Sequence, residues 1–538
     1  MNWRAYLFLA LLGGCVLLGL AAFQPVPGYM DAEYYFGGGL RLYQGFGFSE
    51  QILWNYLDDP QGLPHPSHTY WMPLASILAF AGMKALGSSA FWAGRLGFIL
   101  AAICIPPLTA SLAYRFSRQR DSAFFAGMLA VFSAFYLPYL PTTDTFAIYM
   151  LLGTMWLWLG DGYSLRIDRR EVAGWAHPFL FSFLLGLISG GMHLTRADGL
   201  MWAVFAVGLV LFSSPWDAPN LKPKLMSLGV CLAGYFLVMA PWMLRNQNVF
   251  GSPLSPGGLK TLWLTDYDDL YLYPASQLTF ERWWGSGLAE IIKSRLWASG
   301  INLQSVLAVQ MEIFLAPLVL WGWWRLRHER LMRLGALIWG VTMGAMTLIF
   351  PFAGARGGFF HSGAAFQPLF WATVPVGLEG FIAWGNRLRG WRASQARWFF
   401  QSGLLLLAGV LSVIIVTNRV LRTNGRNPGD SQRWSESMAR YVHLEQALQA
   451  LAPAEGAVIL VNNPPGFYLA SGRSSIAIPD GDIASLLAVA RRFGGRYLLL
   501  EPSHPRGLEE LYQNPGDRPG LRYLTSLDGV HIFEFYDR

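Results

Sequence analysis

Apolar residues run along the chain in eleven long stretches that are separated by polar or turn-forming segments. A helix that crosses the hydrocarbon core of a bilayer needs roughly 20 mostly apolar residues, because each residue rises by about 1.5 Å. The pattern therefore predicts eleven membrane-spanning helices, centred on residues 5–23, 92–113, 122–139, 145–160, 178–193, 199–213, 225–243, 306–324, 334–351, 366–384 and 398–417.

Basic residues gather in alternate gaps between these stretches. Short cytoplasmic loops are enriched in Lys and Arg, so this alternation places the N-terminus in the cytoplasm. It leaves the loops 24–91 and 244–305, and everything after residue 417, on the outer face. Residues 71–87 are also apolar, but counting them as a span would turn the later basic loops outward, so we predict a helix lying in the outer interface. The basic gaps contain Arg115, Arg118, Arg120; Arg166, Arg169, Arg170; Lys222, Lys224; Arg325, Arg327, Arg330, Arg333; and Arg387, Arg389, Arg392, Arg397.

The composition changes abruptly after Thr417, where residues 419–430 are polar and rich in turn formers. Helical stretches then alternate with short apolar runs, a pattern that predicts a small α/β domain. We expect helices at 435–451, 482–493 and 508–512, and strands at 457–461, at 497–500 and on both sides of the turn 527–529. The chain thus divides into a transmembrane domain, 1–417, with a large first outer loop, and an extracytoplasmic α/β domain, 418–538.

Composition supports an α-helical polytopic membrane protein and excludes an ordinary soluble globule. Of the 538 residues, 53% are hydrophobic and 14% are charged, against about 25% charged in a typical soluble protein. The three cysteines, Cys15, Cys104 and Cys231, all lie in apolar stretches and offer no disulfide framework or zinc spacing. The net charge of +7 comes from dispersed loop residues, which membrane orientation explains better than a nucleic-acid partner.

Carboxylates stand at the predicted outer ends of two spans. Asp31 and Glu33 follow the first span, and Asp144 precedes the fourth. An acidic residue before a helix commonly caps its N-terminus, and each of these residues fits that role on its own. Charges at membrane depth are costly, however, at roughly 2.5 to 3.5 kcal/mol for a helix centre on insertion scales. Their convergence on one face therefore favours a functional site.

Two histidines and several aromatic residues follow in the same outer loop, at residues 64–71. His65 and His68 are separated by a proline-containing spacing unlike that of one helix face, and no cysteine is near, so a phosphate contact is favoured over a metal site. Tyr70 joins them as a candidate binding residue, although aromatic residues are expected at membrane interfaces in any case. The sequence predicts no metal ligand set and gives no support for a divalent ion.

Cationic residues also lie on the face that the positive-inside rule leaves poor in arginine. Arg196 joins the fifth and sixth spans, and Arg245 follows the seventh. A guanidinium binds phosphate through paired hydrogen bonds, whereas a single arginine is equally well explained by contact with lipid headgroups. Arg356 and His361 lie in a glycine-rich outer loop that would cover a ligand.

Carboxylates beside cations at an outer membrane surface suit the transfer of a sugar from a lipid phosphate. The leaving phosphate is a weak base that needs charge stabilisation, while the acceptor hydroxyl needs one carboxylate to take its proton. Attack opposite to the departing group inverts the anomeric centre.

The order of several motifs resembles the GT-C superfamily of integral-membrane glycosyltransferases. These motifs are "MDAEYY" after the first span, "PHPSHTYWMPL" before the second, "TTD" before the fourth, "LTRADGL" after the fifth and "PWMLRNQNVFGSPL" after the seventh. Dolichyl-phosphate-mannose protein mannosyltransferases and bacterial lipid A aminoarabinose transferases are the members that it resembles most. The resemblance covers residues 1 to about 420 and implies a polyprenyl-phosphate sugar donor, with an active site on the extracytoplasmic side of the cell membrane.

The resemblance also implies roles for individual residues. Asp31 corresponds to the acidic residue of the first loop, the preferred catalytic base, and Asp144 to a second carboxylate that frames the acceptor site. Arg196 and Arg245 match positions that hold the donor phosphate in the aminoarabinose transferases. His65 stands where those enzymes have a lysine, which would make phosphate binding pH-dependent because an ordinary histidine has a pKa near 6.5.

Oligosaccharyltransferases of this superfamily carry a Trp-Trp-Asp-Tyr-Gly motif, which this sequence lacks. Transfer of a single hexosyl or pentosyl unit is therefore favoured, with no firmly predicted cofactor. Two other classes stay open: a transporter or flippase of lipid-linked saccharides, and a non-catalytic scaffold for glycan assembly. Transporters commonly show internal repeats and charges near the bilayer midplane, neither of which the sequence displays. The sugar, the acceptor and the oligomeric state are left undetermined.

Overall fold

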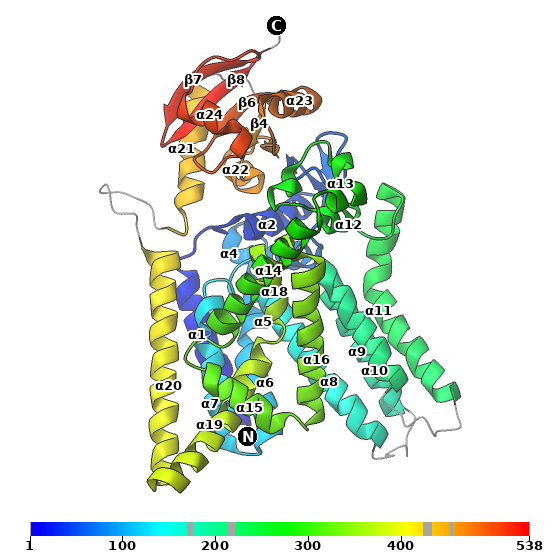
Figure 1. Cartoon of the computed structure of the whole chain (residues 1–538), viewed down its shortest axis with the longest axis vertical. Helices are drawn as coiled ribbons and strands as arrows, with labels where there is room; N and C mark the ends of the chain where they lie inside the picture. The colour runs from blue at the N-terminus through cyan, green and yellow to red at the C-terminus, as the bar shows by residue number, and fades with distance from the viewer. Residues whose placement is uncertain (1, 169–175, 213–220, 423–432, 452–455, 537–538) are drawn as a thin grey trace.

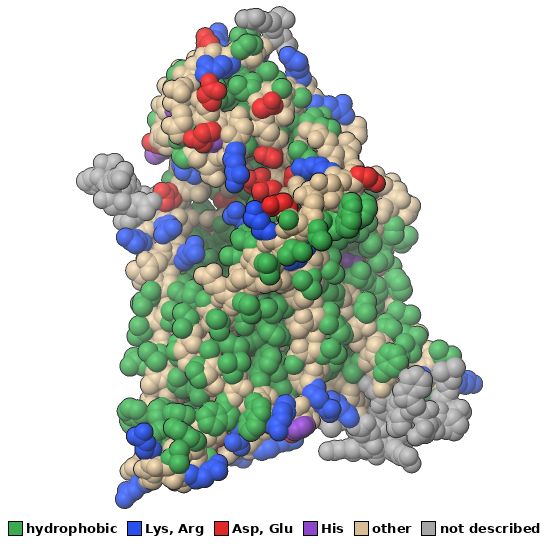
Figure 2. All heavy atoms as spheres, viewed as in Figure 1, with side chains coloured by type: hydrophobic (Ala, Val, Ile, Leu, Met, Phe, Trp, Pro, Cys, Tyr) green, Lys and Arg blue, Asp and Glu red, His purple; other side chains and the backbone are tan. Residues whose placement is uncertain are grey.

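The computed structural model describes residues 2–168, 176–212, 221–422, 433–451 and 456–536. A broad band of apolar side chains covers the middle of the face seen in Figure 2, with Lys and Arg along its lower edge and charges of both signs above it. The N-terminus lies at the lower end of the band and the C-terminal domain at the upper end (Figure 1). The predicted residues Arg169 and Arg170 lie outside the described part of the chain.

Helices of 8 to 30 residues form the band. They are α1 (Trp3–Ala21), α5 (Leu96–Ile103), α6 (Ile105–Ser117), α7 (Arg120–Val131), α8 (Phe146–Asp168), α9 (Ala176–Thr195), α10 (Leu200–Phe212), α11 (Leu221–Phe250), α15 (Ala316–Leu326), α16 (Arg330–Gly344), α19 (Gln367–Arg389) and α20 (Ala393–Val416). Other helices of this part are α2 (Met30–Tyr43), α3 (Leu74–Leu86), α4 (Phe91–Gly94), α12 (Pro256–Lys260), α13 (Phe280–Gly285), α14 (Leu288–Ser305), α17 (Pro351–Ala353) and α18 (Phe359–Ala364).

Within the described residues, five helical segments are long and apolar enough to cross a membrane: Trp3–Ala21, Phe91–Ser117, Lys222–Phe250, Arg330–Ile349 and Ala393–Leu421. The other predicted stretches also contain helix, and three of their helices, α8, α9 and α19, have 23, 20 and 23 residues. The number of eleven spans therefore stays a prediction. Helix α3 has 13 residues, fewer than the roughly 20 that a span requires, in keeping with its exclusion from the predicted spans.

One predicted span, 306–324, is broken in its middle. The helix stops after Gln310 and resumes as α15, and between them Glu312 and Ile313 have positive φ angles of 46° and 59°. The buried Glu312 accepts a hydrogen bond from Trp371 Nε1 at 2.8 Å. The break was not predicted, because most of the residues on both sides of Gln310 and Glu312 are apolar.

Glycines let the helices approach closely. A methyl group built on Gly186 of α9 would lie 1.8 Å from the carbonyl oxygen of Cys231 in α11. One built on Gly377 of α19 would lie 1.9 Å from the carbonyl oxygen of Leu318 in α15. Helices in lipid associate through this kind of backbone contact, because lipid provides no hydrophobic drive for association.

The C-terminal domain is an α/β structure, as predicted. Its helices are α21 (Glu436–Leu451), α22 (Pro464–Ser471), α23 (Ile483–Phe493) and α24 (Glu509–Gln513), and its strands are β4 (Val458–Val461), β5 (Ser475–Ala477), β6 (Gly495–Leu500), β7 (Leu521–Leu527) and β8 (Val530–Phe535). Strands β7 and β8 form a hairpin whose turn residues, Asp528 and Gly529, both have positive φ, as a two-residue hairpin turn requires.

The sheet of this domain takes its edge strand from the first outer loop. Its order is β2-β5-β4-β6-β8-β7, where β2 is Ile52–Leu53 and runs parallel to β5. A second, two-stranded sheet in the same loop pairs β1 (Ser49–Glu50) with β3 (His65–Pro66). The outer loop is thus built into the C-terminal domain, and helix α2 lies between that domain and the apolar band (Figure 1).

Candidate functional site

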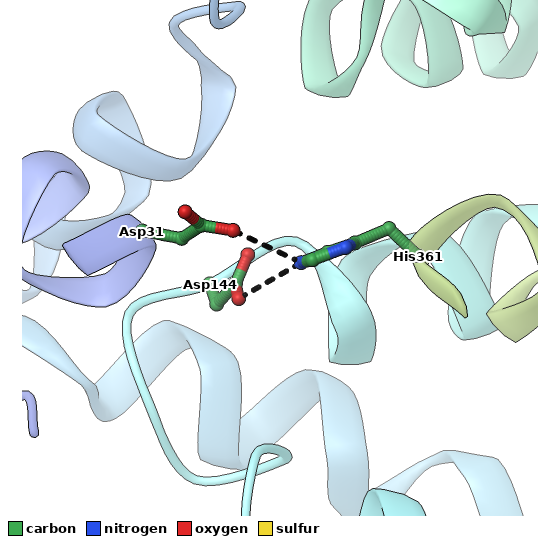
Figure 3. Close-up of side chains that lie close together, drawn as sticks. All are labelled: Asp31, Asp144 and His361. Atoms are coloured by element: carbon green, nitrogen blue, oxygen red, sulfur yellow. Dashed lines mark hydrogen bonds and ion pairs between the residues drawn. The ribbon is translucent and has the colours of Figure 1, made fainter. Parts of the chain in front are cut away.

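Three side chains from distant parts of the sequence meet above the apolar band. Asp31 lies in the first turn of α2, Asp144 in the turn before α8, and His361 in α18. His361 Nε2 lies 3.2 Å from Asp144 Oδ2 and 3.4 Å from Asp31 Oδ2, with both carboxylates pointing toward the ring (Figure 3). Each of the three residues was a candidate in the sequence, and the structure brings them into one cluster.

Asp144 is held rigidly as an anion. The Tyr29 hydroxyl donates to its Oδ2 at 2.7 Å, and the backbone N–H of Thr145 donates to its Oδ1. Burial opposes its ionisation, but His361, Tyr29 and Thr145 together outweigh burial and lower its pKa. Its side chain is only 1% exposed. Asp144 therefore supplies a fixed negative charge that orients its neighbours.

Asp31 differs from Asp144 in both access and basicity. Its side chain is 29% exposed. Withdrawal from bulk water raises its pKa to about 6, and the charge of Asp144 adds to the rise, while His361 and Arg196 partly offset it. Asp31 is thus ionised at neutral pH, more basic than its neighbour, and reachable by a ligand.

His361 is oriented so that both ring nitrogens face acceptors. The ring stacks on Phe146 with centroids 4.1 Å apart, and its Nδ1 lies 2.9 Å from the carbonyl oxygen of Gly357. Burial disfavours the charged ring, but the carboxylates of Asp144 and Asp31 outweigh burial and raise its pKa. The arrangement favours an imidazolium that donates through both nitrogens.

Arg196 places a second cation beside the cluster. Its Nε donates to Asp198 Oδ1 at 2.9 Å, its Nη2 lies 3.4 Å from the carbonyl oxygen of Gly358, and its guanidinium lies over the Tyr149 ring at 5.8 Å. Its charge acts on both carboxylates of the cluster. The side chain is 15% exposed, so part of the guanidinium remains accessible to an anion.

Arg356 lies farther out, in a kinked segment where Gly357 has a φ of 119°. Its guanidinium packs over the ring of Tyr267, 5.1 Å from the centroid, and is exposed. Tyr267 comes from the second outer loop and is close enough to Asp31 for the carboxylate to raise its pKa, after the larger effect of burial. Arg356 and Tyr267 therefore pair across two loops near Asp31.

Arg245 and His65, two other residues predicted to bind the donor phosphate, make contacts outside the cluster. The Arg245 guanidinium donates to the carbonyl oxygen of Phe48 at 3.2 Å and packs on Trp242 and Phe250, because α11 continues as helix to Phe250. His65 lies between two carboxylates, with Nδ1 3.3 Å from Glu50 and Nε2 2.9 Å from Asp58. Both contacts give these residues structural roles, and their predicted binding of phosphate gains no support.

His68 is also enclosed, with its ring nitrogens 2.8 Å from Ser67 Oγ and 3.0 Å from Ser76 Oγ. Burial lowers its pKa to about 3, with a smaller effect from Arg245. Tyr70 packs on Trp54, and burial raises its pKa, with further effects from charges that include Arg196 and Asp31. Tyr70 is therefore the one aromatic candidate that borders the cluster.

Glu33 points away from the cluster, toward the C-terminal domain. It is fully buried, and its Oε2 accepts a hydrogen bond from Asn463 Nδ2 at 2.8 Å. Successive residues of a helix are about 100° apart, so Asp31 and Glu33 emerge on nearly opposite sides of α2. This separation places Glu33 outside the predicted substrate site.

No family model matches the sequence, and no curated protein sequence matches it. Among solved structures, the apo oligosaccharyltransferase of Archaeoglobus fulgidus is similar, at a TM-score of 0.56 and 12% identity over 94% of this chain and 70% of that one. Its complex with zinc and sulfate gives a TM-score of 0.57 at 11% identity over 94% and 68%. The complex of archaeal AglB from the same organism with an inhibitory peptide and a dolichol-phosphate gives 0.53 at 11% over 92% and 69%.

The chain has the fold of the GT-C membrane glycosyltransferases. This finding confirms the fold that the order of the motifs predicted. At such low identity the likeness carries no information about single residues, so the roles of the cluster rest on its own geometry.

Within this GT-C fold, the cluster fits a divalent cation. Asp31, Asp144 and His361 each offer one ligand atom, and the three atoms lie within 4.8 Å of one another. Two carboxylate oxygens and one imidazole nitrogen form a donor set that suits manganese or zinc. Sequence spacing did not reveal this ligand set, because the ligands come from three segments that only the fold joins.

Tyr29 and Tyr267 were not among the sequence candidates. Tyr29 stands immediately before the first motif and two positions before Asp31, so its position in the sequence was an available signal. Tyr267 lies in a segment without a functional motif, and only the packing of the outer loops reveals it. Asn463 lies in the loop after the predicted strand 457–461, and only the packing reveals its contact with Glu33.

Proposed function

We propose that this protein is an inverting glycosyltransferase that moves a single sugar from a polyprenyl-phosphate donor to an acceptor at the outer face of the cell membrane. The observation that carries the proposal is the meeting of an accessible carboxylate, Asp31, with the cations His361 and Arg196. The GT-C fold supports it, because its solved members include an oligosaccharyltransferase bound to dolichol-phosphate. The absence of the Trp-Trp-Asp-Tyr-Gly motif favours a single sugar.

Asp31 is the general base of the proposed reaction. An acceptor hydroxyl attacks the anomeric carbon, a new C–O bond forms, and Asp31 takes the hydroxyl proton. The bond from the anomeric carbon to the phosphate oxygen breaks, and its electron pair leaves with the phosphate. Asp144 is unsuited to the base role, because Tyr29, Thr145 and His361 already occupy its oxygens and it is closed to solvent.

Arg196 and His361 stabilise the charge that grows on the leaving phosphate. Fixed donors in a site with little water act most strongly where charge develops, and they need no reorganisation during the reaction. Asp144 keeps His361 protonated and oriented. A divalent cation held by Asp31, Asp144 and a neutral His361 would take the place of the imidazolium and supply positive charge for the phosphate when bound.

The proposal is tested with purified protein in lipid nanodiscs, given a panel of polyprenyl-phosphate sugars and monitored for release of polyprenyl phosphate. Asp31→Asn keeps the shape of the side chain and removes the base, so we expect release to fall by a factor of about 10² to 10⁴. The matched control is Asp59→Asn, since Asp59 is a carboxylate in the same outer loop that pairs with Lys260 at the surface. Release at the normal rate by the Asp31 variant would refute the assignment of the base.

A further inference from the structure

The C-terminal domain reaches the catalytic helix through a hydrogen bond between two side chains. Asn463, at the N-cap of α22, donates from Nδ2 to Glu33 Oε2 at 2.8 Å. The same asparagine accepts a hydrogen bond from the backbone N–H of Gly466 through its Oδ1 at 3.1 Å. That second bond fixes the orientation of the amide, because only an oxygen accepts from the N–H, so the NH₂ group must face Glu33.

Gly466 packs tightly against this contact. A methyl group built on Gly466 would lie 2.7 Å from Glu33 Oε2 and 2.6 Å from Asn463 Nδ2. Glu33 is fully buried, and its Oε1 has no hydrogen-bond partner among the described residues. A buried carboxylate is costly unless it is well bonded, so this one depends heavily on the amide of Asn463.

Helix α2 is therefore held from two sides at its first turns. On one side Asp31 faces His361, and on the other Glu33 faces Asn463. The chain just before α2 is also tied to the C-terminal part, where Trp434 Nε1 donates to the carbonyl oxygen of Val26 at 2.8 Å. Beyond α2, strand β2 pairs with β5.

We infer that Glu33 and Asn463 are positioning residues, through which the C-terminal domain holds α2 at the place where Asp31 meets the reacting groups. The inference rests on the proposed function, because it assigns Asp31 as the base. A catalytic group that shifts by about 1 Å costs roughly 10²-fold in rate. Loosening this bond should therefore lower kcat while the donor, bound by other groups, keeps its KM.

A polarity swap tests the inference. Asn463→Asp keeps an oxygen to cap α22 but removes the amide that donates to Glu33, so we expect kcat to fall by about tenfold or more, with the donor KM changed by less than about threefold. Glu33→Gln alone should keep most of the activity, because the glutamine carbonyl still accepts from Asn463. The double variant Glu33→Gln/Asn463→Asp should recover kcat to within about threefold of Glu33→Gln, because the introduced glutamine amide donates to the introduced carboxylate.

The matched control is Asn514→Asp, which adds the same charge to an exposed position of the same domain. Wild-type kcat in the Asn463→Asp variant, or a double variant as slow as that single variant, would overturn the inference. Hydrogen exchange of the α2 amides gives a readout without turnover: it should be faster in Asn463→Asp than in Asn514→Asp and slow again in the double variant. If the wild-type protein released no polyprenyl phosphate from any donor, the proposed function would fail, and equal α2 exchange in the two single variants would separately overturn the inference.

Discussion

The imidazole of His65 links two segments of the first outer loop. It joins Glu50 of β1 to Asp58. Burial, which disfavours its charge, is outweighed by the hydrogen bonds that its ring donates to Asp58 and Glu50, and these raise its pKa to about 9. Burial raises the pKa of Glu50 despite this bond, so Asp58, which lies nearer, is the stronger partner. Both ring nitrogens thus face carboxylates within the loop, and phosphate binding by His65 stays a prediction.

The raised pKa of His65 predicts a pH-dependent stability. In the unfolded chain the pKa is near 6.5, so the stabilising contribution is complete below that pH and is lost as pH rises through about 9. The loss amounts to at most about 3 kcal/mol, or several degrees in thermal midpoint. We expect the midpoint of the wild-type protein to fall between about pH 6.5 and 9.5 more steeply than that of His65→Gln. Parallel profiles for the two proteins would contradict the predicted pairing.

The ligand geometry at Asp31, Asp144 and His361 predicts an effect of chelation. We expect protein dialysed against EDTA to release polyprenyl phosphate at least about tenfold more slowly, and added Mn²⁺ to restore the rate, because a divalent ion stabilises phosphate charge. His361→Gln removes one ligand, so a higher Mn²⁺ concentration should be needed to reach half of the maximal rate. Full activity after chelation would assign the cluster to its metal-free form, in which His361 and Arg196 supply the positive charge.

At the scale of single elements, helix packing depends on the glycines at the crossings. Alanine normally favours a helix over glycine by about 0.5 to 1 kcal/mol. At Gly186 the added methyl group meets the backbone of α11, whereas at Gly208 in α10 nothing lies within 4 Å. We therefore expect Gly186→Ala to destabilise the protein by about 1 to 3 kcal/mol, while Gly208→Ala leaves it unchanged or more stable. Thermal midpoints in the same detergent test this, and equal midpoints would refute the close crossing.

The sequence was most informative where one physical signal dominates. Long apolar runs located the helices, and polar residues at their ends included Asp31, Asp144 and His361. The same signal placed Arg245 after the seventh helix, because the apolar run ends near residue 243. The helix in fact continues to Phe250 and contains Arg245. It also passed over the break at Glu312, since hydropathy does not register backbone conformation. Glu33 and Asp31 lie on opposite sides of α2, and the sequence reveals this only when the boundaries of the helix are known.

At the scale of the whole molecule, the sheet order makes the two parts interdependent. Strand β5 pairs on one side with β4 and on the other with β2 from the first outer loop. An excised C-terminal domain would expose that edge of β5, and unpaired edges promote association with other chains. We expect residues 433–538 alone to form oligomers, and a fusion that appends residues 49–56 to be monomeric and more stable. Size-exclusion chromatography beside a fusion with a scrambled segment tests this, and identical elution of the two fusions would contradict it.

The pairing of β2 with β5 also bears on biosynthesis. The ribosome makes β2 early and β5 near the end of the chain, so β2 must stay without this partner until almost all of the protein has been translated. Contacts between such distant segments form slowly. A chain truncated after the last membrane helix would therefore insert without the partner of β2, and we expect proteases to cleave the loop that contains this strand.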